Sequence, residues 1–210
     1  MARNKQPPKV GILLECGREG LDFHLCRRIC ALLREQHKAD FVEELVPMDN
    51  KERLLEECAT VAALQLRTGC DRVVILWDEE PAYPDKHKPL CWSHERQRIL
   101  NSLAGANVQP TSVHLVCIER AIETWLLHDD RLLSAILTRP THPKKVKLPA
   151  NPHRISNVKG AMIRLFRQHG HTYVDVTWAS RLAANLEDLK KLRRCKTFRR
   201  FAERVSGSPI

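Results

Sequence analysis

The sequence has no long hydrophobic segment and no visible secretion signal. No run of apolar residues approaches the roughly 20 that span a bilayer. The opening residues, Met1 to Pro8, are polar and lead into the first predicted strand without the apolar region of a signal peptide. These absences argue against a membrane-spanning helix and against export, so we expect a cytoplasmic protein with no membrane partner.

Closely spaced cysteine pairs and a glycine-rich phosphate loop are also missing. The eight cysteines include no Cys-x-x-Cys pair, and Cys26-x-x-x-Cys30 has no second ligand pair at a spacing typical of zinc sites. Several cysteines fall at apolar positions of predicted elements, which favours reduced core residues over disulfides. The absence of a glycine-rich loop with its lysine disfavours a small-molecule phosphotransferase.

Acidic residues are scarce in the C-terminal third of the chain. Residues 138–210 hold 17 Lys and Arg against 4 Asp and Glu, whereas the whole chain has 35 and 25, so the net charge of +10 lies entirely in this part. Such a patch attracts phosphate backbones, and the basic residues that could contact nucleic acid are Lys144, Lys145, Lys147, Arg154 and Lys159. A solvated surface or a partner-binding face would have the same composition.

Short apolar runs alternate with helical patterns through the first two thirds of the chain. Strands are predicted from Val10, and over residues 41–47, 72–77 and 112–118; helices are predicted over 22–37, from a capping box at Asp49-x-x-Glu52 to Gly69, and over 92–103 and 119–137. This alternation predicts an α/β fold, with a Rossmann-like, mainly parallel sheet flanked by helices.

Three regions follow from this pattern. Residues 9–137 form the predicted catalytic domain, and residues 138–155 form a connection rich in proline and lysine. Residues 156–210 contain further helical patterns, and we expect a basic helical region that packs on the same core.

Acidic residues follow the predicted strands where ligand sites of parallel sheets lie. Glu15 comes after the first strand, Asp78-x-Glu80 after the third, and Glu119 or Glu123 after the fourth. If residues 119–137 form one helix, Glu119 and Glu123 share a face of it. Such acids bind divalent metals that assist phosphoryl transfer. The alternative is that residues 78–80 are only the polar start of a loop and that Glu15 only caps a helix or forms a salt bridge.

Two motifs resemble a known family. Glu15 with the nearby Gly17, together with Asp78-x-Glu80, resembles the TOPRIM fold of topoisomerases, primases and OLD-type nucleases. Residues 122–129, Ile-Glu-Thr-Trp-Leu-Leu-His-Asp, resemble a segment of the DUF4276 family of bacterial TOPRIM-like proteins, and residues 194–201 resemble that family's C-terminal end. The chain departs from the TOPRIM pattern in having Cys16 between Glu15 and Gly17, and Asp-x-Glu in place of Asp-x-Asp.

The resemblance implies a metal-dependent nuclease. Glu15 would be a general base or a metal ligand, Asp78 and Glu80 would be metal ligands, and Glu123 would join them or support them; the cofactor would be Mg²⁺ or Mn²⁺. Asp22 or Glu19 would be a further acid, although both lie at a helix start where acids are favoured anyway. His87 and His94 are weaker candidates for phosphate contact.

The family further implies a setting and partners. By this resemblance, we expect the protein to be an effector of bacterial anti-phage defence that cleaves DNA or RNA. It would work with an ATPase partner and be able to form homo-oligomers. The alternative is a non-catalytic subunit that binds nucleic acid or regulates an ATPase complex.

Overall fold

The protein is built around a four-stranded parallel sheet. The computed structural model describes residues 6–80, 92–139 and 144–210. The strands are β1 (Lys9–Leu14), β2 (Val42–Pro47), β3 (Arg72–Asp78) and β4 (Val113–Ile118), in the order β2-β1-β3-β4. All neighbouring pairs are parallel, and Leu14 of β1 lies beside Leu76 of β3. The predicted α/β fold with a parallel sheet is confirmed.

The two central strands are hydrophobic on both faces because helices cover both sides of the sheet. Ile12 and Val74 point into the core on one face, whereas Leu13 and Ile75 point into the core on the other. This double burial explains why β1 and β3 are continuous aliphatic runs rather than alternating ones.

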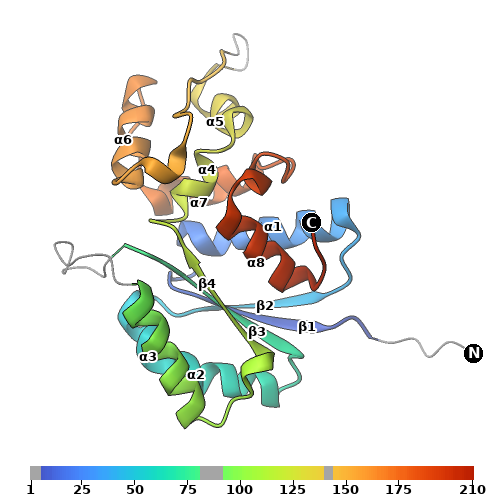
Figure 1. Ribbon diagram of the computed structural model, residues 1–210. Helices are drawn as coiled ribbons and strands as arrows, with labels where there is room; N and C mark the ends of the chain where they lie inside the picture. Colours follow the sequence, from blue (N-terminus) through green and yellow to red (C-terminus); the bar gives the residue numbers. More distant parts are fainter. Residues whose placement is uncertain (1–5, 81–91, 140–143) are drawn as a thin grey trace, which may run out of the picture.

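The helices form two layers around the sheet. Helices α1 (Leu21–His37), α7 (Asp175–Ala184) and α8 (Lys196–Ser206) lie on one face, and α2 (Lys51–Arg67) and α3 (Trp92–Gly105) lie on the other (Figure 1). The remaining elements are α4 (Glu123–Leu126), α5 (Asp130–Leu137), α6 (Val158–Gln168) and the 3₁₀ turns η1 (Pro110–Ser112), η2 (Pro152–Arg154) and η3 (Leu192–Arg194).

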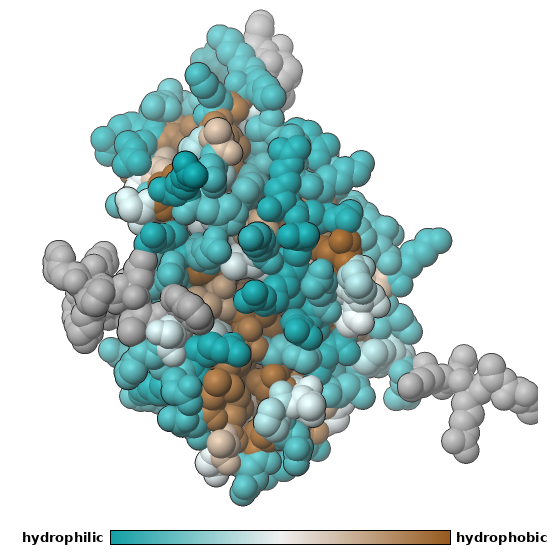
Figure 2. Space-filling view, in the orientation of Figure 1, coloured by the Kyte–Doolittle hydropathy of each residue, from teal (hydrophilic) through white to brown (hydrophobic). Residues whose placement is uncertain are grey.

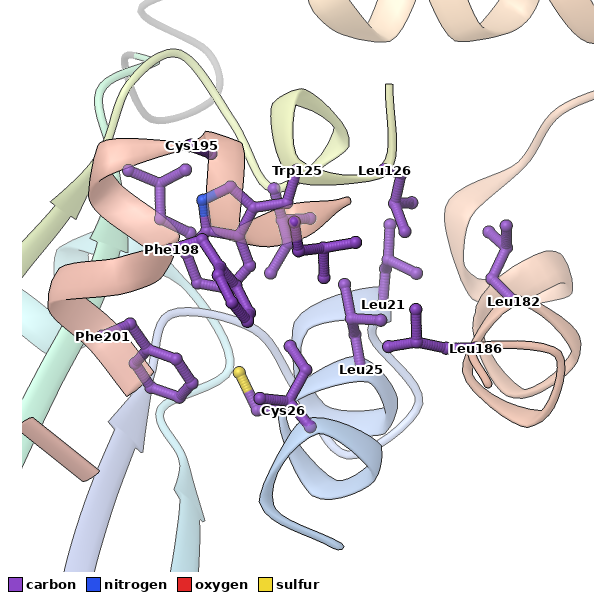
Figure 3. Packing of buried hydrophobic residues seen from close by; sticks show 14 of the residues in the cluster. Leu21, Leu25, Cys26, Trp125, Leu126, Leu182, Leu186, Cys195, Phe198 and Phe201 are labelled. Atoms are coloured by element: carbon purple, nitrogen blue, oxygen red, sulfur yellow. The ribbon is translucent and has the colours of Figure 1, made fainter. Parts of the chain in front are cut away.

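Trp125 joins the C-terminal helices to the rest of the core. Its ring centroid lies 5.4 Å from that of Phe198 and 5.5 Å from that of Phe201, both on α8, and its Nε1 donates to Thr197 Oγ1 at 3.0 Å. Figure 3 shows Trp125, Phe198 and Phe201 together with Leu25 of α1. Residues from β1, α1 and α8 therefore share one hydrophobic core.

Two local predictions are wrong. Residues 119–137 do not form one helix, because Arg120 has a positive φ of 67° and Asp129 starts a new helix by accepting hydrogen bonds from the backbone N–H groups of Arg131 and Leu132, both at 3.1 Å. Helix α2 is capped by Asn50 rather than Asp49: the Asn50 side chain accepts from the Arg53 N–H at 2.9 Å.

The face of the molecule in Figure 2 is mostly hydrophilic, and a strip of hydrophobic residues crosses its lower half. Among the helices that the structure describes, none is long and apolar enough to cross a membrane.

Candidate functional site

The candidate site lies at the carboxyl ends of β1 and β3. The strand order places β2 on one side of β1 and β3 on the other, so the helices that follow β1 and β2 cover opposite faces of the sheet. Ligands of open α/β sheets bind where the connections diverge in this way. Glu15 directly follows β1, and Asp78 is the last residue of β3.

Glu15 and Asp78 are in direct contact. The backbone N–H of Asp78 donates to Glu15 Oε2 at 3.1 Å. Burial raises the pKa of Glu15 well above its usual range, and the Asp78 carboxylate raises it further. Burial likewise raises the pKa of Asp78 to about 6. The fold has thus placed two acids side by side where their charged forms are disfavoured.

Asp22 and Glu123 add two more carboxyl groups. Protein atoms pack around the Asp22 carboxyl, although the residue keeps some exposed surface; burial, Asp78 and Glu123 together raise its pKa to about 7. Glu123 on α4 is only 1% exposed and accepts a hydrogen bond from the Tyr173 hydroxyl at 3.1 Å. Burial raises its pKa to about 7. Acids from three separate segments therefore influence one another at this edge of the sheet.

Glu80 completes this group, whereas its neighbour Glu79 does not. Glu80 Oε2 lies 3.8 Å from Lys159 Nζ. The Glu79 carboxylate instead accepts from the Arg120 backbone N–H at 3.2 Å and pairs with the Arg120 guanidinium. We call the resulting set the acidic site; its members are Glu15, Asp22, Asp78, Glu80 and Glu123.

Two lysines face the acidic site. Lys51, only 2% exposed, donates to the backbone carbonyl oxygens of Asp78, at 2.7 Å, and Glu80, and its Nζ lies 3.5 Å from Asp78 Oδ1. Burial lowers the pKa of Lys159, but Glu123 and Asp78 outweigh that effect and raise it. The sequence did not reveal Lys51, because a lysine in the first turn of a helix is ordinarily solvated.

The acidic site fits a hard divalent cation in ligand type and in charge. Glu123 Oε2 is buried without a hydrogen-bond partner in the described part of the chain, and Asp78 Oδ1 has only the ion pair with Lys51, which is unusual for native carboxylates. Five carboxyl groups face two lysines, and oxygen ligands suit Mg²⁺ or Mn²⁺. Among the described residues, however, no three of these acids have oxygens all within 4.8 Å of one another, so a bound cation would have to draw the side chains together.

The predicted nucleic-acid contacts fall into two groups. Lys159 lies over the acidic site, whereas Lys144, Lys145, Lys147 and Arg154 are exposed on the connection before α6. Lys145 pairs with Asp130 at 3.1 Å, and Lys144 and Lys145 line a pocket with Lys191. Within residues 144–155, none of these four side chains forms an ion pair with a member of the acidic site.

Other sequence candidates lie elsewhere. Glu119 is not on a helix with Glu123; it follows β4, and its carboxylate contacts His153. Glu19 and His94 are exposed, and His87 lies outside the described residues. Asp22 is the secondary candidate that the structure brings next to Asp78 and Glu123.

Comparison of the chain with family models, with curated proteins and with solved structures gave no match. The resemblance to the DUF4276 family and the TOPRIM fold therefore stays a prediction.

Proposed function

We propose that this protein is a Mg²⁺- or Mn²⁺-dependent nuclease that hydrolyses phosphodiester bonds in DNA or RNA. The main support is the acidic site itself. Carboxyl groups at the ends of β1 and β3 interact electrostatically with one from α1 and one from α4, and the pKa values of these four groups are raised. Perturbed acids gathered at a strand switch point are typical of catalytic sites.

Four members of the acidic site and the neighbouring Lys51 have roles in this proposal. Asp78, Glu80 and Glu123 would hold the cation with Glu15, and the cation would neutralise the charge that develops on the phosphate and provide a more acidic water. Glu15, whose carboxyl group lies beside the end of β3, would accept a proton from the attacking water. Lys51 fixes the end of β3 through two carbonyl oxygens.

The basic residues would hold the substrate. The Lys159 side chain is 47% exposed while its ammonium group faces the acids, so it is positioned to contact a phosphate oxygen next to the cation. The exposed residues Lys144, Lys145, Lys147 and Arg154 would contact the flanking backbone as point charges. This arrangement predicts binding that weakens as salt concentration rises.

The wider setting follows from the family resemblance. We also propose that the protein is a cytoplasmic effector of bacterial anti-phage defence. It would act with an ATPase partner and be able to form homo-oligomers.

A cleavage assay tests the proposal. Purified protein is incubated with plasmid DNA, single-stranded DNA and tRNA in Mg²⁺, Mn²⁺ or EDTA, beside Glu15→Gln, Asp78→Asn and the matched control Glu79→Gln. We expect metal-dependent cleavage by the wild type and Glu79→Gln, and its loss in the other two variants. Cleavage that persists in both Glu15→Gln and Asp78→Asn, or that is absent with every metal, would reject the nuclease.

A second candidate is a non-catalytic subunit that binds nucleic acid or regulates an ATPase complex. It is favoured by the position of Lys51, whose ammonium group already pairs with Asp78 as a built-in cation. Salt-sensitive nucleic-acid binding without cleavage under any metal would support this candidate.

A further inference from the structure

A second cluster of ligand-type side chains lies away from the acidic site. It consists of His128 between α4 and α5, His153 in η2 and Cys195 directly before α8; we call it the His–Cys cluster. One ligand atom from each lies within 4.8 Å of the other two, and the part of the chain that the structure describes contains no other such set of three His, Cys, Asp or Glu residues. Three distant segments therefore bring nitrogen and sulfur ligands to one point.

We propose that the His–Cys cluster binds one zinc ion. Imidazole nitrogen and thiolate sulfur are the ligands that zinc prefers. The Nε2 atoms of His128 and His153 face each other at 3.2 Å. Zn–N bonds of about 2.0–2.1 Å in a tetrahedral site place two nitrogens about 3.3 Å apart, so the two rings already have nearly the required spacing.

Side chains around the cluster are arranged as supports for such ligands. Glu119 Oε2 lies 2.5 Å from His153 Nδ1, the ring nitrogen that does not face His128. A carboxylate in this position orients a metal-binding histidine and leaves its other nitrogen free to coordinate. This contact also explains why Glu119 is not part of the acidic site.

Thr197 plays the corresponding role for Cys195. Its Oγ1 accepts a hydrogen bond from Trp125 Nε1 at 3.0 Å and lies 3.2 Å from Cys195 Sγ. Indole N–H groups only donate, so the threonine hydroxyl keeps its own hydrogen for the sulfur. A hydroxyl in this position orients the Cys195 sulfur, as the Glu119 carboxylate orients His153.

The zinc would act as a structural clamp. It would tie together the segment after α4, the connection around η2 and the start of α8, with a water molecule in the fourth position, because both histidines are partly exposed. The clamp shares no ligand with the acidic site and does not depend on nuclease activity. Without metal, the two imidazoles would instead hydrogen-bond to each other, with Glu119 holding the outer nitrogen of His153.

Metal analysis of the full-length protein distinguishes these two arrangements. Wild type, Cys195→Ser and His153→Gln are purified without chelators, and zinc per chain is measured by mass spectrometry; Cys58→Ser and His114→Gln are the matched controls. We expect about one zinc per chain in the wild type and both controls, and its loss in the two cluster variants. Wild type that holds no zinc and takes up none on titration would overturn the proposal, as would zinc retained by both cluster variants.

Two further measurements test the zinc site even if Cys195→Ser or His153→Gln fails to fold. Co²⁺ added to metal-depleted wild type is expected to give a thiolate-to-cobalt charge-transfer band and the visible bands of tetrahedral cobalt; octahedral bands alone would overturn the proposal. His128→Cys, which replaces one zinc ligand with another, is expected to retain zinc. Glu15→Gln is also expected to retain it, which separates this result from the outcome of the cleavage assay.

Discussion

The acidic site and the His–Cys cluster differ in how the protein treats charge. In the acidic site, burial and neighbouring carboxyl groups raise the pKa values of Glu15, Asp22, Asp78 and Glu123, and Glu123 Oε2 is buried without a hydrogen-bond partner among the described residues. In the His–Cys cluster, the two rings face each other, and the carboxylate and the hydroxyl are positioned beside their ligands. The acidic site therefore concentrates negative charge that a cation would offset, whereas the His–Cys cluster gathers nitrogen and sulfur ligands that suit zinc.

Both sets depend on the short helix α4. Glu123 begins α4 and His128 follows it by two residues, so one turn of chain supplies a member to each set. Between them, Trp125 is fully buried against α8. Substitution of Trp125 should therefore disturb both sets at once, whereas other changes should affect them separately.

The largest expected effect is that of Trp125→Ala. Loss of a fully buried indole that also hydrogen-bonds Thr197 should lower the free energy of unfolding by about 3–5 kcal/mol, measured by urea denaturation. The same variant should lose both nuclease activity and zinc. Ile163→Ala, at a position 41% exposed on α6, is the control and should change stability by under about 1 kcal/mol. A stable Trp125→Ala protein with both properties intact would contradict the shared role of α4.

Asp78→Asn should act on one set only. Removing this carboxylate should reduce cleavage by about 100- to 1000-fold, equivalent to about 2.7–4 kcal/mol of barrier, because the cation loses a ligand next to the phosphate. Zinc content should not change. Glu79→Gln, one residue along the chain but turned toward Arg120, should remain within about threefold of wild type. Equal losses in the two variants would show that charge near β3, rather than the site, controls activity.

The fold was largely predictable from the sequence, because the central strands β1 and β3 are apolar runs and each long helix has an apolar stripe. The prediction failed at residues 119–137, where the hydrophobic pattern continues across a break made by Arg120 and capped by Asp129. Hydrophobic periodicity indicates which residues are buried, but it does not mark a turn that is buried together with the helices beside it. The break in this segment therefore could not be seen in the pattern.

The sites were predictable to different degrees. Glu15 and Asp78 could be identified because the ends of parallel strands meet at one edge. Asp22 remained ambiguous, since acids at helix starts are common. The His–Cys cluster could not be found, because its ligands lie 25 and 42 residues apart and only tertiary packing brings them together.

Glu123→Gln should stabilise the metal-free protein at high pH. Because the pKa of Glu123 rises from 4.5 to about 7 on folding, its neutral form favours the folded state below about pH 4, and this contribution is lost as pH rises to about 7. Glutamine stays neutral and can still accept from Tyr173, so the variant should gain about 1–3 kcal/mol at pH 8 and little at pH 4. The measurement is urea denaturation in EDTA at both pH values.

Tyr173→Phe serves as the comparison for that experiment, because it removes the hydrogen bond to Glu123 and keeps the carboxyl group. It should not raise stability at pH 8. A Glu123→Gln protein with the same pH dependence as the wild type would mean that Glu123 does not titrate in this range.

The smallest effects should come from the lysines. Lys159→Met removes the ammonium group that faces the acids and should lower kcat/KM by about tenfold, or about 1.4 kcal/mol. Lys147→Met, on the exposed connection, should cost about twofold and reduce the salt slope of binding by about one. Both effects are measured by nuclease kinetics at several salt concentrations. A larger loss of kcat/KM in Lys147→Met than in Lys159→Met would place the reacting phosphate away from the acidic site.

The proposed nuclease requires that the acidic site bind a divalent cation. A crystal of the wild-type protein soaked in Mn²⁺ tests it directly through the anomalous scattering of manganese. We expect an anomalous peak bonded to carboxylate oxygens of Glu15 and Asp78, with Asp78 Oδ1, now paired with Lys51, as a ligand of the metal. No peak at the ends of β1 and β3, with Lys51 still paired to Asp78, would contradict it.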